Sequence, residues 1–329
     1  MSFEGLRECM GNLNVAIISP NDYAKNIGKK GTASDLTLYD IKKGHDTVSL
    51  IEPTKYPERL ASLFYACSMS THAMVVVDEI NASFGESVIM LNCLGVSKGW
   101  FVLRNYITPD RVQPLIKGTS LEGYRFIEDD ATAIREMLMA EAAQVPMGEG
   151  AFPNGAVPID HHFNVKGVGT VVLGYVARGT VRRHDMLSAL PTNKQAQVRS
   201  IQKHDDDYDV SDLGDRVGLA LKNIESDELD RGYVLTNDPT MRCEKVIEGK
   251  VELIKYWPSP LKEGMVLHVG HWMQFQPSRV ESVDNGTDWR NPTVKISMEK
   301  ELVFPPGSKA VLTQLEGGKL RIAGMITLP

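Results

Sequence analysis

A glycine-punctuated stretch in the middle of the chain, residues 159–183, places the strongest limit on the fold. It reads IDHHFNVKGVGTVVLGYVARGTVRR, and the β-branched run at residues 170–173 is typical of a buried strand. Gly167, Gly169, Gly174 and Gly179 interrupt it at the spacing of bulges and turns. Short strands with glycine corners are what a small closed β-barrel needs, so this stretch predicts a barrel.

The length and composition of the chain limit its organisation and its surroundings. The 329 residues exceed what one hydrophobic core usually holds, and they predict two or three domains. No apolar run reaches the roughly 18–20 residues that a membrane helix needs, and the first residues lack the layout of a signal peptide. Cys9, Cys67, Cys93 and Cys243 form no C-x-x-C pair. We therefore expect a cytoplasmic protein with reduced thiols, no membrane association and no metal site.

The charges of the chain are unevenly distributed. The formal net charge of −6 argues against non-specific binding of nucleic acid, and no DNA partner is expected. Between residues 160 and 203, however, seven residues are basic and two are acidic. The basic residues are Lys166, Arg178, Arg182, Arg183, Lys194, Arg199 and Lys203. This excess fits the binding of a specific RNA, and a solvated strand surface explains it equally well.

The pattern of predicted elements changes along the chain. The first part alternates apolar strands with amphipathic helices, which predicts a mostly parallel α/β sheet. The strands are expected at residues 14–18, 47–51, 73–78 and 100–103, and the helices at 58–69, 86–94 and 129–143. Proline and glycine crowd residues 145–158, after which only short strands recur, with a second break near 237–239. We predict an α/β domain at 1–147 and β-barrels at 151–238 and 239–329.

Three motifs in the barrel region resemble the second domain of elongation factors of the EF-Tu class, closest to the selenocysteine-tRNA factor SelB. They are F-x-V-K-G-x-G-T-V-V-x-G at residues 163–174, G-D-R-V-G-L at 214–219 and R-G-Y-V-L at 231–235. Residues 242–246, 260–265 and 320–324 resemble the third domain of that family. The resemblance implies α/β plus all-β architecture: a P-loop-GTPase-like doubly wound domain followed by two small β-barrels.

The family also implies a phosphate loop, of the form G-H-x-D-H-G-K-[ST], after the first strand. Residues 19–26 read SPNDYAKN at that place. Asp22 and Lys25 match the motif, whereas Ser19 and Ala24 replace both of its glycines. Asn26 replaces the hydroxyl group that would bind Mg²⁺. A loop without these glycines cannot wrap phosphates closely with its backbone N–H groups.

The other two nucleotide motifs of the family are degenerate as well. Residues 52–56, EPTKY, stand where the family has D-x-P-G-H; Glu52 could partly replace the aspartate, but Tyr56 positions water poorly. Residues 105–108, NYIT, lack the aspartate that recognises guanine. We predict that GTP hydrolysis and tight GTP binding are lost, with no catalytic residue. GTP and magnesium remain possible ligands only by resemblance, through Asp22, Lys25 and Glu52.

By the same resemblance, an aminoacyl pocket is expected at the start of the second domain. Asp160 and Arg216 match residues of the SelB pocket, while His161 stands in place of an arginine. Asp215, which neighbours Arg216, is also assigned to this pocket, although these two residues could instead form a structural ion pair at a barrel corner. Adjacent residues of a strand point to opposite faces, so His161 and its neighbour His162 do not suggest a metal site.

The sequence therefore predicts a SelB-like translation elongation factor paralogue that binds tRNA, or RNA like it, through its barrels. The residues expected at the RNA backbone are Lys166, Arg178, Arg182, Arg183 and Arg199. The resemblance is greatest to the archaeal EF-Pyl factors, whose name implies pyrrolysyl-tRNA, and it makes the ribosome a possible partner. Two alternatives remain open: a non-catalytic scaffold that binds a protein partner, and a GTP-binding factor with unusual motifs.

Overall fold

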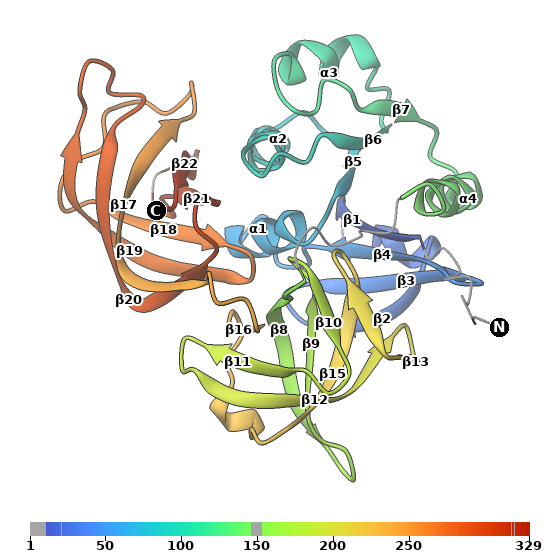
Figure 1. The fold of residues 1–329 in the computed structure, drawn as a ribbon. Helices are drawn as coiled ribbons and strands as arrows, with labels where there is room; N and C mark the ends of the chain where they lie inside the picture. Colours follow the sequence, from blue (N-terminus) through green and yellow to red (C-terminus); the bar gives the residue numbers. More distant parts are fainter. Residues whose placement is uncertain (1–10, 21, 146–152, 317, 319) are drawn as a thin grey trace.

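The computed structural model describes residues 11–20, 22–145, 153–316, 318 and 320–329. They form an α/β domain and two closed six-stranded β-barrels, so the predicted fold class is confirmed (Figure 1). Cys9 and the expected boundary between residues 147 and 151 lie outside the described residues. Within the described chain, no helix combines the length and apolarity needed to cross a membrane.

The α/β domain contains a seven-stranded sheet in the order β2-β3-β4-β1-β5-β6-β7. Five of the strands are parallel: β4 (Asp46–Glu52), β1 (Asn12–Ile18), β5 (His72–Val77), β6 (Lys98–Leu103) and β7 (Arg125–Ile127). The continuous apolar runs of β1 and β5 are buried, as expected of central parallel strands covered on both faces. The covering helices are α1 (Leu60–Ser68), α2 (Ala82–Cys93), α3 (Pro109–Ile116) and α4 (Ala131–Ala142).

The connection after β1 differs from a phosphate loop that opens into a helix. In the described part of this connection, the helical structure is limited to η1 (Tyr23–Asn26), a four-residue 3-10 turn. The chain then enters an antiparallel hairpin at the sheet edge, formed by β2 (Lys29–Ala33) and β3 (Thr37–Lys43). So short a turn provides no α-helix dipole to attract an anion.

The first barrel closes because β11 (Met186–Leu190) pairs with both β12 (Lys194–Lys203) and β16 (Val234–Thr236). The remaining strands of the ring are β8 (Ala156–Val165), β9 (Gly169–Tyr175) and β15 (Arg216–Lys222). Outside the ring lie β10 (Thr180–Arg182), β13 (Asp206–Tyr208), β14 (Val210–Asp212) and the 3-10 turn η2 (Ser226–Glu228). Gly174 is required at a strand crossing, because a Cβ atom there would lie 2.5 Å from the carbonyl oxygen of Pro158.

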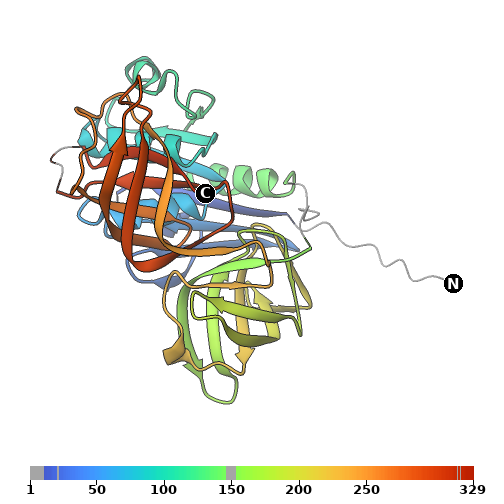
Figure 2. The same cartoon turned by 60° about the vertical axis from the view of Figure 1, so that its left-hand side comes forward.

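The second barrel is closed in the order β17-β20-β19-β18-β21-β22. Its strands are β17 (Arg242–Leu253), β18 (Val266–His271), β19 (Gln274–Asp284), β20 (Thr293–Phe304), β21 (Lys309–Thr313) and β22 (Ile322–Thr327). Figure 2 shows the first barrel below the other two bodies, as in Figure 1.

The α/β domain and the second barrel share a hydrophobic core. Phe64 of α1 packs against Phe275 of β19, with ring centroids 5.5 Å apart. Met273 and Val311 of the second barrel belong to the same buried cluster. A partly buried ion pair joins Glu86 of α2 to the Arg321 guanidinium, with an Nε–Oε1 distance of 2.9 Å. The shared core indicates that these two bodies move as one unit.

Candidate nucleotide and RNA sites

The carboxylate of Glu52 fills the loop that follows β1. Its two oxygens accept hydrogen bonds from the backbone N–H groups of Asp22 (3.1 Å) and Ala24 (3.3 Å) and from the Ser19 hydroxyl (3.1 Å). The Glu52 side chain is buried, with 2% of the residue exposed. Backbone N–H groups that could bind a phosphate are therefore bound to a carboxylate of the same chain.

Tyr39 of β3 completes the hydrogen-bonding around Glu52. Its hydroxyl donates to Asp22 (3.2 Å) and lies 3.4 Å from Glu52. Burial, and then the negative charges of Glu52 and Asp22, raise the pKa of Tyr39, so the phenol keeps its proton and remains a donor. Of the predicted nucleotide-binding residues, the structure brings Asp22 and Glu52 together and leaves the Lys25 side chain exposed to solvent.

A second network links loops at the carboxyl ends of the parallel strands, where open α/β sheets bind their ligands. The Tyr23 hydroxyl donates to Asp129 (2.8 Å), and the Arg104 guanidinium pairs with the same carboxylate (2.7 Å) and with Asp78 (3.5 Å). The Asn105 side-chain amide donates to the Asp78 carbonyl (3.1 Å). These groups follow β1, β5, β6 and β7, so the edge is tied together by side chains of the protein.

A cavity of about 400 Å³ remains beside this network. Its charged lining residues are Glu58, Asp78 and Glu79, and none of its described lining residues is a lysine or arginine. Tyr56 also lines it, with its hydroxyl bound to the Ser83 carbonyl at the start of α2 (2.8 Å). Even with Arg104 paired to Asp78, the lining keeps an excess of carboxylates, which repels a triphosphate, so it does not suit a nucleotide.

In the first barrel, a buried carboxylate joins Arg216 and His161. The Arg216 Nη2 atom lies 2.6 Å from an Asp160 oxygen, and its Nη1 donates to the Gly174 carbonyl (2.7 Å). The His161 Nδ1 atom lies 3.5 Å from the same Asp160 oxygen. Burial raises the pKa of Asp160, but Arg216 and His161 outweigh it and hold that pKa below its usual value.

A β-bulge explains how neighbouring residues of β8 come to interact. Strict alternation along the strand would place the side chains of Asp160 and His161 on opposite faces. The register of β8 with β9 instead shifts between Ile159 and His161. Such a bulge redirects a side chain, and here it lets the imidazole reach the adjacent carboxylate. His162 contacts the Ser226 hydroxyl (3.0 Å), on η2.

Asp215 is separate from this group. Its carboxylate pairs with Lys203 (2.8 Å) and lies 3.4 Å from the Asn12 amide of β1. The side-chain amides of Asn12 and Asn14 both donate to the Gly214 carbonyl, at 2.5 and 2.7 Å. Asp215 and Arg216 do not form the alternative ion pair with each other, because Asp215 pairs with Lys203 and Arg216 pairs with Asp160. Asp215 helps to attach the first barrel to the α/β domain.

The five basic residues expected at RNA lie at two places on the first barrel. Lys166, Arg182, Arg183 and Arg199 are exposed. Arg199 of β12 donates to the Val168 carbonyl in the β8–β9 turn that carries Lys166 (3.0 Å), and Arg183 pairs with Asp209 (3.4 Å). The segment after β10 also reaches β12, because the His184 N–H donates to the Val198 carbonyl (2.8 Å). Arg178 instead pairs with Asp238 (3.1 Å), near the junction with the second barrel.

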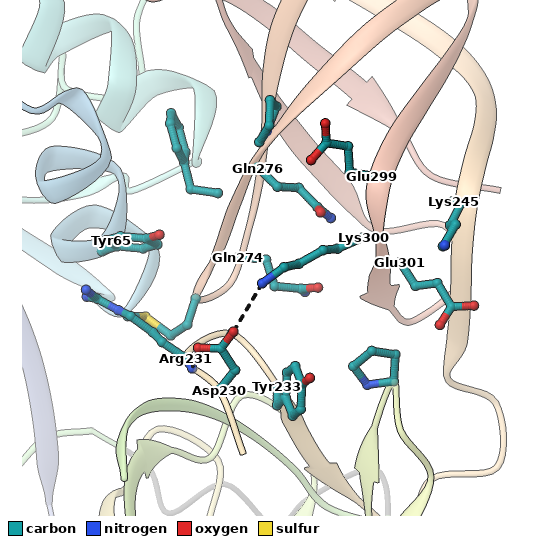
Figure 3. A pocket seen from close by; sticks show the side chains of 15 residues that line it. Tyr65, Asp230, Arg231, Tyr233, Lys245, Gln274, Gln276, Glu299, Lys300 and Glu301 are labelled. Carbon is teal, nitrogen blue, oxygen red and sulfur yellow. Dashed lines mark hydrogen bonds and ion pairs between the residues drawn. The ribbon is translucent and has the colours of Figure 1, made fainter. Parts of the chain in front are cut away.

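Sequence reasoning missed a cavity of about 580 Å³ at the junction of the three bodies (Figure 3). Arg231, Lys245 and Lys300 contribute positive charge to its lining, balanced by acidic residues such as Asp230, which pairs with Lys300 (3.1 Å). The Arg231 guanidinium lies over the Tyr65 ring, 4.2 Å from its centroid. Arg231 is the arginine of the motif R-G-Y-V-L, which in the sequence is evidence only of family likeness. The cavity could not be predicted from this motif, because residues of the other domains also line it.

Comparisons with known proteins agree with this arrangement. The family "Elongation factor Tu domain 2" matches residues 169–236. An uncharacterized protein of Methanocaldococcus jannaschii is 38% identical over 302 residues, which cover 92% of this chain and 94% of that protein. The selenocysteine-specific elongation factor of the same organism is 24% identical over 350 residues, covering 94% and 74% of the two chains. The chain belongs to the SelB-like elongation factors.

Solved structures of the SelB-like family share the three-body fold. Translation elongation factor SelB from Methanococcus maripaludis, in complex with the GTP analogue GppNHp, superposes with a TM-score of 0.83 at 19% identity. That match covers 97% of this chain and 79% of the SelB chain. A bacterial selenocysteine-specific elongation factor matches with a TM-score of 0.79 at 15% identity, over 96% of this chain and 58% of that one. These likenesses concern the fold.

Proposed function

We propose that this SelB-like factor binds tRNA, or an RNA that resembles tRNA, through its two barrels and without a GTP cycle. The observation that carries the proposal is a contrast between two bodies. The α/β domain fills its phosphate loop with Glu52, whereas the first barrel keeps Asp160, His161 and Arg216 together and carries exposed basic residues elsewhere on its surface. The barrel chemistry suits a charged RNA ligand, and the loop chemistry does not suit a nucleotide.

The RNA-binding half of the proposal rests on the first barrel. Lys166, Arg182, Arg183 and Arg199 offer exposed positive charge on an acidic chain, which favours a local RNA contact over general polyanion binding. A rigid guanidinium such as Arg216 can hold an aminoacyl group in a partly dry pocket. His161, in place of a second arginine, favours an aminoacyl group other than selenocysteine, and the family resemblance makes pyrrolysyl-tRNA the candidate to test. Contact with the ribosome is proposed on the same resemblance.

The nucleotide half of the proposal rests on how poorly the residues present would accommodate GTP and magnesium. In the described part of the loop where they would bind, the N–H groups of Asp22 and Ala24 already donate to Glu52. The adjacent cavity is lined by carboxylates, and Tyr56 is held at α2 rather than beside the loop. These residues do not fit a magnesium-bound triphosphate, so we assign no catalytic step to this chain.

A filter-binding titration tests the proposed function. Purified protein is titrated against aminoacylated and deacylated tRNA pools, each with and without GTP and Mg²⁺. We expect binding that distinguishes the two pools and does not change with GTP. Binding that requires GTP would contradict the nucleotide half and favour a GTP-binding factor with unusual motifs. Absence of binding in every condition would contradict the RNA half and favour a protein-binding scaffold.

Removing the Glu52 carboxylate should expose the loop to external anions. Glu52→Ala leaves the N–H groups of Asp22 and Ala24 without their acceptor, which should cost about 1–3 kcal/mol of unfolding free energy. Pyrophosphate should then raise the melting temperature of the variant, because a ligand that binds only the folded state stabilises it. The wild-type protein should not respond to pyrophosphate. Thermal unfolding with and without the anion measures both effects.

Glu58→Ala is the matched control for this experiment. It removes the same charge from an exposed position that lines the neighbouring cavity. The control should keep the stability of the wild-type protein and its indifference to pyrophosphate. A wild-type protein that is stabilised by pyrophosphate as strongly as Glu52→Ala would show that Glu52 does not block the loop.

A further inference from the structure

The loop between β2 and β3 crosses from the α/β domain to the first barrel. Ser34 in this loop lies with its hydroxyl 3.2 Å from the His161 Nε2 atom. The next residue, Asp35, binds the Arg231 guanidinium, whose Nη1 donates to both carboxylate oxygens at 2.8 and 2.9 Å. Two adjacent loop residues therefore contact the candidate aminoacyl pocket and the junction cavity.

Further contacts along the same hairpin are also polar. Asp40 of β3 lies 3.3 Å from His204, and Lys42 pairs with Asp206. The first barrel also contributes Tyr175 to the apolar core that the α/β domain shares with the second barrel, so its interface has a polar part and an apolar part. Ion pairs with partly exposed partners contribute little and weaken with salt, and polar contacts between domains are typical of interfaces that open. The polar contacts of the hairpin are therefore the part of this interface that can open.

Arg231 is incompletely satisfied in the closed arrangement. A guanidinium carries five N–H donors, and Asp35 uses only those of Nη1. The Nε and Nη2 atoms are buried, and the described residues supply no hydrogen-bond acceptor for them. Arg231 also lines the junction cavity, which is large enough for a phosphate group. Because guanidinium binds carboxylate and phosphate with the same geometry, Asp35 occupies a position that a phosphate could take.

We propose that Ser34 and Asp35 form a displaceable clasp, in which Asp35 holds Arg231 where an RNA phosphate binds and Ser34 covers His161. RNA binding and the closed arrangement then compete for the same guanidinium. This inference rests on the proposed RNA-binding function. It also explains how a factor without a nucleotide switch can still have a closed state, since the ligand itself opens the clasp.

Asp35→Asn tests the clasp in the full-length protein. The substitution removes the competing negative charge and keeps the shape of the side chain. We expect the affinity for the tRNA pool to rise roughly tenfold, because RNA no longer has to displace a charge-assisted hydrogen bond from Arg231. The slope of the logarithm of the affinity against the logarithm of salt concentration should steepen by about one unit, because Arg231 gains a phosphate contact. Asp110→Asn, an exposed change of the same charge on α3, should leave both quantities unchanged.

Lys42→Met and the solution shape of the protein complete the experiment. Lys42→Met removes another ion pair of the hairpin without freeing Arg231. We therefore expect this variant to keep the wild-type salt slope of tRNA binding. Small-angle scattering without RNA should give Asp35→Asn a larger radius of gyration than the wild-type protein. If the wild-type protein binds RNA and Asp35→Asn binds it equally well or more weakly, the clasp is overturned and the proposed RNA-binding function stands. If neither protein binds RNA, the proposed function fails, and with it the competition that the clasp requires.

Discussion

Replacing Arg216 with alanine should destabilise the first barrel by about 3–5 kcal/mol, the usual cost of leaving one member of a buried ion pair without its partner. Asp160 is 2% exposed, and Arg216 is the charged group nearest to its carboxylate. The substitution also leaves the Gly174 carbonyl without its guanidinium donor. Native-state hydrogen exchange measures this loss, because the amides of β9 and β15 report the opening of this barrel directly.

Arg183→Ala is the control for this prediction. Arg183 also pairs with an aspartate of the first barrel, but the two side chains are 50% and 79% exposed. An exposed pair contributes at most about 1 kcal/mol, so the control should change the exchange free energy only slightly. An Arg216→Ala variant that loses no more stability than Arg183→Ala would mean that the Asp160–Arg216 pair is solvated in solution.

The same pair should make the first barrel sensitive to acid. Folding lowers the pKa of Asp160 below its ordinary value near 3.9, because the stabilising effect of Arg216 and His161 exceeds the opposing effect of burial. The resulting stability is present above the unfolded pKa, and it is lost as the pH falls through the folded pKa. Acid titration of the exchange-resistant amides should therefore show destabilisation below about pH 4. The Arg216→Ala variant should lose most of this dependence.

The parts of the fold that were predictable from the sequence are those with strong local patterns. The apolar runs that became β1 and β5 carry their own signal, since buried parallel strands need continuous hydrophobic residues. The glycine-punctuated stretch did the same for β8 and β9. The hairpin of β2 and β3 was missed. All five residues of β2 are exposed or half-buried, and an edge strand of that kind has no periodic pattern.

The candidate sites were less predictable, because long-range contacts determine the partners of each residue. Glu52 was expected to replace a magnesium-binding aspartate, whereas the structure turns it toward backbone N–H groups about thirty residues earlier. Asp160 and Arg216 were grouped by family likeness, but the bulge that admits His161 has no sequence signature. The Asp35–Arg231 contact spans 196 residues, and no local pattern relates the two.

Charge reversal of Arg182, Arg183 and Arg199 should weaken binding of the tRNA pool by roughly a hundredfold or more at low salt. All three side chains are exposed, so their substitution to glutamate should not disturb the barrel core. If each contacts a phosphate, the slope of log affinity against log salt should become shallower by roughly two to three units, about 0.9 for each lost contact. Filter binding at several salt concentrations measures both quantities.

The decisive comparison is with a triple variant of equal charge elsewhere on the molecule. Arg111, Lys117 and Arg135 are exposed on or next to α3 and α4 of the α/β domain, so reversing them changes the net charge by the same amount. A local RNA site predicts that this control keeps the wild-type salt slope and loses little affinity. Equal losses of affinity in the two triple variants would mean that the overall charge of the protein, and not specific phosphate contacts, determines RNA binding. The contrast between the variants thus separates a barrel-bound RNA from a non-specific one.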